Sequence, residues 1–121
     1  MGKYIKAVDD LTDRRGNIYI VQHLDTDYLL IHTEEGYLRG GETHDGWQMN
    51  ALLKGTILWV TPEKEHIYTA LSLIRTEAGV PHMMNSLTDS LMLEWRERPL
   101  EIPVNYYEPY RTLIKKRMEE P

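Results

Sequence analysis

Short runs of alternating apolar and polar residues follow one another along most of the chain, and turn residues separate them. Turn signals stand at Asp13-Arg14-Arg15-Gly16-Asn17, at Asp25-Thr26-Asp27 and at Glu35-Gly36. The runs rich in β-branched and aromatic residues are 18–21, 28–31, 47–53, 56–60, 67–75 and 91–95. Runs this short and this closely spaced predict roughly eight or nine strands in an all-β sandwich or barrel.

The end of the chain has a different period. Glu108-Pro109 places a proline where the first turn of a helix accepts one. The apolar side chains that follow recur at helical spacing: Tyr110, Leu113, Ile114 and Met118. We therefore expect a short C-terminal helix over about residues 108–119, packed on the barrel or on a partner subunit.

Residues 47–53 alternate between apolar and polar side chains as far as Ala51. The odd positions are apolar, whereas Gln48 and Asn50 are polar. Because successive side chains of a strand point to opposite faces, the two polar residues share one face. That face meets solvent in a surface sheet, or lines the mouth of a small barrel whose outer wall is apolar. Lys54-Gly55 then predicts a tight turn, with 56–60 as the hairpin partner.

Composition narrows the choice of function. The 121 residues include 41% hydrophobic and 27% charged residues and carry a net charge of −5, which is typical of one soluble domain spanning 1–121. An acidic chain without a basic face argues against a nucleic-acid partner. No window approaches the roughly 20 apolar residues of a membrane span. We expect no membrane partner and a cytoplasmic location.

The glycine-rich stretch 36–55 holds the most distinctive spacing. Gly36, Glu42, His44, Gln48 and Gly55 reproduce every interval of the first motif of the cupin superfamily, G-x5-H-x-H-x3/4-E-x6-G. Glu42 stands where the first histidine is usual, and Gln48 where the glutamate is usual. Within 79–85, His82 followed by Asn85 is similar to the second motif, with the asparagine one residue early.

Within the superfamily, the chain most resembles the sugar-nucleotide 3,4-ketoisomerases and related WxcM-like proteins. The opening turn at Asp13, the segment Arg39-Gly40-Gly41-Glu42-Thr43-His44 and the tail Tyr106-Tyr107-Glu108-Pro109-Tyr110-Arg111 carry this likeness. The resemblance implies a single-domain cupin, an RmlC-like jelly-roll barrel (double-stranded β-helix) with a short C-terminal helix. It also implies a small-molecule ligand inside the barrel.

One interpretation of these residues is a metal site. Glu42, His44 and His82 would supply two imidazoles and one carboxylate, with Gln48 as a neutral fourth ligand. Such a set suits a divalent first-row ion, namely Fe, Mn, Ni or Zn. The ion would polarise a carbonyl or activate oxygen.

The ketoisomerase resemblance implies a second, metal-free interpretation. His44 would then act as the base beside a keto group. Arg39 would hold phosphate, and Tyr37 would donate to an enolate oxygen. Glu42 in place of the first histidine repels phosphate but raises the basicity of a nearby imidazole.

Three classes of function therefore stay open. They are an enzyme on a small carbonyl or sugar-nucleotide substrate, a metal-dependent cupin such as a dioxygenase, and a binding or sensory cupin without catalysis. We also expect a homodimer, because small cupins leave sheet edges and apolar outer faces that a second subunit covers.

Overall fold

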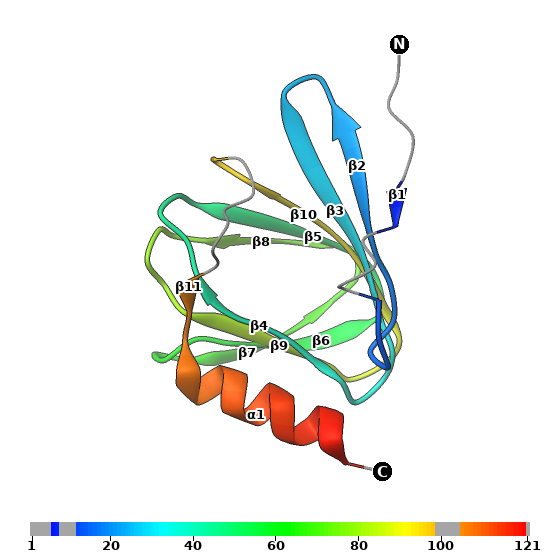
Figure 1. Cartoon of the computed structure of the whole chain (residues 1–121), viewed down its shortest axis with the longest axis vertical. Helices are drawn as coiled ribbons and strands as arrows, with labels where there is room; N and C mark the ends of the chain where they lie inside the picture. Colours follow the sequence, from blue (N-terminus) through cyan, green and yellow to red (C-terminus); the bar gives the residue numbers. More distant parts are fainter. Residues whose placement is uncertain (1–5, 8–11, 99–104, 121) are drawn as a thin grey trace.

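Two antiparallel sheets face each other and form a barrel, and one helix lies against its outside (Figure 1). This computed structural model describes residues 6–7, 12–98 and 105–120. Its strands are β1 (Lys6–Ala7), β2 (Ile18–His23), β3 (Thr26–Thr33), β4 (Leu38–Thr43), β5 (Gln48–Lys54), β6 (Thr56–Val60), β7 (Glu65–Thr69), β8 (Ser72–Thr76), β9 (His82–Ser86), β10 (Ser90–Arg96) and β11 (Asn105–Tyr106).

The larger sheet has the order β1-β2-β3-β10-β5-β8, and the smaller has the order β11-β4-β9-β6-β7. Chain neighbours often belong to opposite sheets: β4 and β5 do, as do β5 and β6. The chain therefore winds back and forth between the two walls. This arrangement confirms the predicted all-β jelly-roll barrel.

The polar face of β5 points into the barrel rather than into solvent. Gln48 is 2% exposed and Asn50 is 0% exposed, whereas Leu53 on the opposite face is 41% exposed. Deeper along the same inner face, Leu52 joins an apolar core that fills the middle of the barrel. This core consists of Ile18, Leu29, Ile31, Leu52, Ile57, Trp59, Ile74, Met84 and Met92.

The predicted hairpin between residues 47–53 and 56–60 is wrong. β5 pairs with β10 and β8, while β6 pairs with β7 and β9. Gly55, with φ +94°, turns the chain from one sheet into the other, and a Cβ there would meet the backbone oxygen of Asp89. The glycine thus marks a corner between sheets, where only a residue without a side chain fits.

The run 67–75 is two strands rather than one. β7 lies at an edge of the smaller sheet and β8 at an edge of the larger, and the break falls at Ala70-Leu71. Inward-facing and outward-facing side chains alternate on both sides of the break. The sequence pattern therefore resembles that of one continuous strand.

The C-terminal helix α1 (Glu108–Glu119) has the predicted bounds. Its Tyr110 and Ile114 are buried against Met83 of β9 on the outer face of the smaller sheet, whereas Leu113 is 49% exposed. In Figure 1 the helix lies below β4 and β9, away from the larger sheet. No helix in the described part of the chain has the length and hydropathy needed to cross a membrane.

Candidate functional site

Four elements meet at one end of the barrel and carry the residues of the cupin-like motifs. Glu42 lies near the end of β4, His44 in the turn that follows, Gln48 at the start of β5, and His82 at the start of β9. Glu42 pairs directly with His82 in the β4–β9 ladder. We call this end of the barrel the cup.

Glu42 and Gln48 lie on different strands, and His44 lies in the turn between them. The β4–β9 register shifts between Gly40 and Glu42, and the chain then turns from the smaller sheet into the larger. Gly40 and Gly41 make this possible, because both have positive φ values, +99° and +75°. The glycines bend the strand so that its end reaches the cup.

The two histidines of the motifs do come together. The ring centroids of His44 and His82 are 5.3 Å apart. His44 is 6% exposed and His82 is 3% exposed. The Nδ1 atom of His82 lies 3.0 Å from the carbonyl oxygen of Val80, which fixes the orientation of the ring. The Nε2 atom of His44 is buried and has no partner within hydrogen-bond geometry in the described part of the chain, although the ring interacts with the side chain of Gln48.

Burial makes both imidazoles neutral near pH 7. It lowers the pKa of His44 to about 4, with further lowering by the charges of Arg96 and His82. Burial also lowers the pKa of His82, although its bond to Val80 opposes the shift. Each neutral ring therefore keeps a nitrogen lone pair that can accept a hydrogen bond or, transiently during a reaction, a proton.

Glu42 is shifted in the direction opposite to that of the histidines. Burial, and next the nearby charge of Glu94, raise its pKa to about 7. A carboxyl group with this pKa is populated in both protonation states near neutral pH. Such a group can give or take a proton at the pH at which most enzymes work.

A buried network beside the motif residues was not predicted. The carboxylate of Glu94 accepts hydrogen bonds from Gln48 Nε2 at 3.2 Å and from Asn50 Nδ2 at 3.0 Å. Its second oxygen accepts a bond of 2.9 Å from Arg96, and both side chains of this ion pair are 10% exposed. Gln48 also donates to Asn50 at 2.7 Å.

The sequence held one signal for this network. Glu94 interrupts an otherwise apolar run, and it shares the parity of buried Met92. A charge on the inner face of a strand requires a partner inside the barrel. The identity of that partner depends on the pairing of β10 with β5, which a local pattern does not reveal.

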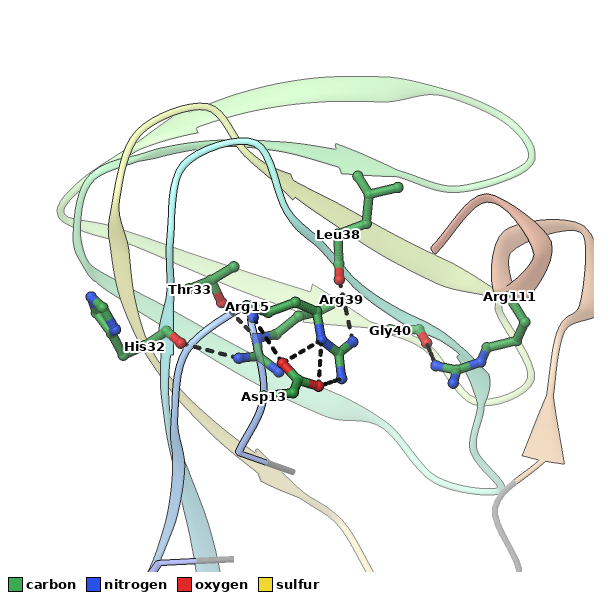
Figure 2. A network of polar contacts seen from close by, with 8 residues as sticks. All are labelled: Asp13, Arg15, His32, Thr33, Leu38, Arg39, Gly40 and Arg111. Carbon is green, nitrogen blue, oxygen red and sulfur yellow. Dashed lines mark hydrogen bonds and ion pairs between the residues drawn. The ribbon is translucent and has the colours of Figure 1, made fainter. Parts of the chain in front are cut away.

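Tyr37 and Arg39 have contacts of another kind (Figure 2 shows Arg39). Arg39 donates to Thr33 Oγ1 at 2.7 Å and to the carbonyl oxygen of His32 at 3.1 Å. Burial, and next the charge of Arg15, lower its pKa to about 10. The ring of Tyr37 lies under the guanidinium of Arg117, 4.4 Å from its centroid. None of the contacts described for these two residues involves His44 or His82.

Figure 2 also shows what surrounds Arg39. Arg15 pairs with Asp13 at 2.7 Å and reaches the carbonyl oxygen of Leu38 at 3.3 Å. Arg111 of α1 donates to the carbonyl oxygen of Gly40 at 3.0 Å. These contacts tie the turn near Asp13 and the C-terminal helix to β4, the strand that leads to Glu42.

The metal-ligand set expected from the motifs stays a prediction. The imidazoles of His44 and His82 lie close together, and Gln48 Oε1 is without a partner. However, no group of three His, Cys, Asp or Glu side chains in the described part of the chain is placed to hold an ion.

Comparison with known proteins supports the fold. No protein-family model and no curated protein matches the chain. Solved structures do. A cupin superfamily protein from Desulfitobacterium hafniense is 11% identical, with a TM-score of 0.60 over 79% of each chain. KdgF from Halomonas is 13% identical, with a TM-score of 0.62, over 78% of this chain and 95% of its own.

The capsular polysaccharide assembling protein CapF from Staphylococcus aureus is 15% identical, with a TM-score of 0.68. The match covers 87% of this chain and 32% of CapF, so the likeness concerns about a third of that protein. At such identities the comparisons establish the fold alone, and they do not single out the WxcM-like branch. With two facing antiparallel sheets and these structural neighbours, the protein has a cupin fold.

Proposed function

We propose that the protein binds a small carbonyl compound or sugar derivative in the cup and moves a proton on it, as an isomerase does. The observation that carries the proposal is the buried pair of imidazoles, 5.3 Å apart, with Glu42 opposite His82 in the β4–β9 ladder. Two kinds of proton-transfer group thus stand at one end of the barrel.

The chemistry needs no oxidant. One group removes the proton from the hydroxyl-bearing carbon beside the carbonyl, the carbonyl oxygen gains a proton, and an enediol forms. The former carbonyl carbon then gains a proton while the hydroxyl on the neighbouring carbon loses one, so the carbonyl has moved and no electrons are gained or lost. Glu42, with a pKa of about 7, exchanges protons readily at neutral pH. This pKa is close to that of an ordinary histidine, the residue usual at this position in the family that the sequence resembles.

A sugar nucleotide is the more specific form of this proposal. The sequence resembles sugar-nucleotide ketoisomerases, and CapF is described as a protein of capsular polysaccharide assembly. Only the sugar would enter the cup, because Glu42 and Glu94 would repel a diphosphate. Arg39 and Tyr37 already bind protein groups, so His44 and Glu42 carry the proposed proton transfer.

Deuterium exchange tests this proposal directly. The protein is incubated in D2O with free ketoses and dTDP-keto-sugars, and NMR follows deuterium entering the carbon beside the carbonyl. We expect exchange in the wild type and a loss of about 10²-fold or more in His44→Asn and Glu42→Gln. His66→Asn, a change on exposed β7, is the matched control. Exchange that proceeds unchanged in both cup variants would contradict the proposal.

A metal-dependent reaction is the alternative, with Glu42, His44, Gln48 and His82 as the expected ligands. One observation favours it: His82 binds the Val80 carbonyl through Nδ1, as metal-bound histidines often do through the nitrogen that faces away from the ion. Stoichiometric metal in protein purified without chelator, lost in His44→Ala and His82→Ala, would replace the metal-free proposal. Ligand binding without any exchange would indicate a sensory role.

We further propose that two copies associate through the outer face of the larger sheet. On this face Leu93 lies between Leu30 and Ala51, and Ala51 lies beside Leu73. Leu73 is 62% exposed, so an apolar row crosses four strands. Light scattering should give the mass of a dimer, and Leu73→Lys should shift the protein toward the monomer. A wild type that is monomeric at high concentration would refute this.

A further inference from the structure

A row of polar side chains crosses the larger sheet at the cup, and the cupin-like motifs assign only one of its members. Thr76 of β8 pairs with Gln48 of β5, which pairs with Arg96 of β10. Thr76 is 5% exposed and Gln48 is 2% exposed, and the side chain of Arg96 is 10% exposed. Neighbouring strands lie about 5 Å apart, so these three side chains are close enough to act on one ligand group.

Each member of the row keeps one polar atom without a partner. Among the described residues these atoms are Thr76 Oγ1, Gln48 Oε1 and Arg96 Nε, and His44 beside the row interacts with the side chain of Gln48. Buried polar atoms are almost always hydrogen-bonded, since an unpaired one costs about 1–3 kcal/mol. Three such atoms in one row at the end of the barrel indicate a site built for a polar molecule.

Glu94 determines which hydrogen-bonding groups remain. Its carboxylate takes the side-chain amides of Gln48 and Asn50 and one terminal nitrogen of Arg96. What is left is a donor at Arg96 Nε, an acceptor at Gln48 Oε1, and a hydroxyl at Thr76 that can serve as either. A ligand hydroxyl also both donates and accepts, so it matches this set.

We propose that Thr76, Gln48 and Arg96 form a subsite for an uncharged, hydroxyl-bearing part of the ligand. Arg96 Nε donates to the ligand hydroxyl, and the hydroxyl donates to Gln48 Oε1. Thr76 contacts the same or the adjacent hydroxyl. The inference rests on the proposed function, because it describes what the cup recognises.

The charge balance of the row excludes an anionic group. Glu94 already neutralises Arg96 at 2.9 Å. A phosphate or carboxylate entering beside them would bring a second negative charge next to Glu94, whose partner Arg96 is already paired. Burial of an unpaired charge is far more costly than burial of a hydroxyl. The subsite therefore selects neutral hydroxyl compounds.

Residue-resolved NMR titration can test this selectivity. The neutral probes are glycerol, D-glucose and D-fructose, and the anionic probes are glycerol phosphate and glucose 1-phosphate. Each is added to about 10 mM, which saturates a site of millimolar affinity or better. We expect at least one neutral probe to shift the Arg96 Nε–H and Gln48 amide signals, and its phosphorylated counterpart to shift them less.

Thr76→Val measures the contribution of the hydroxyl at nearly constant shape. It should weaken binding of the neutral probe about three- to tenfold, the effect of one neutral hydrogen bond. The same variant should fold at least as stably as the wild type, because it removes an unpaired buried group. Thr69→Val, on exposed β7, is the matched control and should leave binding unchanged.

The outcomes separate this inference from the function that it rests on. If probes shift the ring signals of His44 and His82 but not those of Arg96, the cup binds ligand and the subsite is refuted. If phosphorylated probes bind more tightly through Arg96, the selectivity for neutral groups is refuted. If no probe shifts any of these signals, both the subsite and the proposed ligand class are refuted.

Discussion

The indole ring of Trp59 lies parallel to the imidazole of His82, with centroids 5.7 Å apart and planes 8° apart. Trp59 belongs to the apolar core, whereas His82 belongs to the cup. One contact therefore joins the core that stabilises the barrel to the site where we place its chemistry. This stack, together with the Nδ1 bond to Val80, determines where the ring of His82 lies.

Shortening Trp59 should therefore affect both stability and the site. Trp59→Ala is expected to lower the free energy of unfolding by about 3–5 kcal/mol, as for other large core aromatics. Trp59→Phe should cost less and keep a ring against His82. Urea denaturation measures the loss, and the NMR signals of His82 report the site. Trp47→Ala, at a half-buried position, is the control with the smaller expected loss.

Glu94→Gln should lower the free energy of unfolding more than most other substitutions that keep the shape of the side chain. It keeps the shape but leaves the charge of Arg96 buried without its partner, which costs about 3 kcal/mol. Adding Arg96→Met should recover part of the loss. Glu77→Gln, in the exposed Arg75–Glu77 pair, is the control and should leave the urea midpoint unchanged. Equal midpoints for Glu94→Gln and the wild type would show that the network contributes nothing.

The raised pKa of Glu42 predicts a specific pH dependence of stability. In the folded protein the pKa rises from its ordinary 4.5 to about 7. The folded state thus binds the proton more tightly than the unfolded state. The resulting stabilisation is complete below pH 4.5 and is lost as the pH rises through 7. Across this range the wild type should lose on the order of 3 kcal/mol relative to Glu42→Gln.

Unfolding free energies of the two proteins should be measured side by side from pH 4 to pH 8, and only their difference interpreted. His44, whose pKa falls to about 4, acts in the opposite direction, since its stabilisation is lost as the pH falls from 6.5 toward 4. That effect is present in both proteins and cancels in the difference. A difference that stays constant with pH would mean that Glu42 titrates normally.

Two glycines with similar backbone angles should differ in their tolerance of alanine. Gly40, at φ +99°, has no room for a Cβ, which would lie 2.8 Å from the carbonyl oxygen of His82. Gly79, at φ +76°, has no atom within 4 Å of that position. Gly79→Ala should cost about 1–2 kcal/mol for the backbone alone. Gly40→Ala should cost more and shift the NMR signals of His82. Equal losses would rule out this close contact.

Much of the fold could be predicted from local pattern. Pro109 and the helical spacing of Tyr110 and Ile114 indicated α1, and the alternation of Gln48 and Asn50 identified the polar face of β5. These features succeed because each depends on residues a few positions apart. Motif spacing also brought His44 and His82 to one site, and their rings are 5.3 Å apart. The ligand set that adds Glu42 and Gln48 stays a prediction.

The failures have one physical origin. Gly55 is equally typical of a hairpin and of a corner between sheets, and the choice depends on which distant strand pairs with β5. The division of residues 67–75 into β7 and β8 depends likewise on the two sheets. Glu94 was missed for the same reason, since its partners Gln48 and Asn50 lie more than forty positions earlier in the chain. The pairing of strands that lie far apart in the chain cannot be predicted from a single sequence.

The position of β10 between β3 and β5 has a consequence for how the protein matures during synthesis. The central strand of the larger sheet leaves the ribosome after both of its neighbours, so the β2–β3 pair and the β5–β8 pair have no strand to join them until then. Until β10 is synthesised, the side-chain amides of Gln48 and Asn50 must remain hydrated, because Glu94, which accepts their hydrogen bonds, is not yet present. Such late closure makes folding slow, and a chain released before residue 96 would lack both the binding site and the wall that supports it.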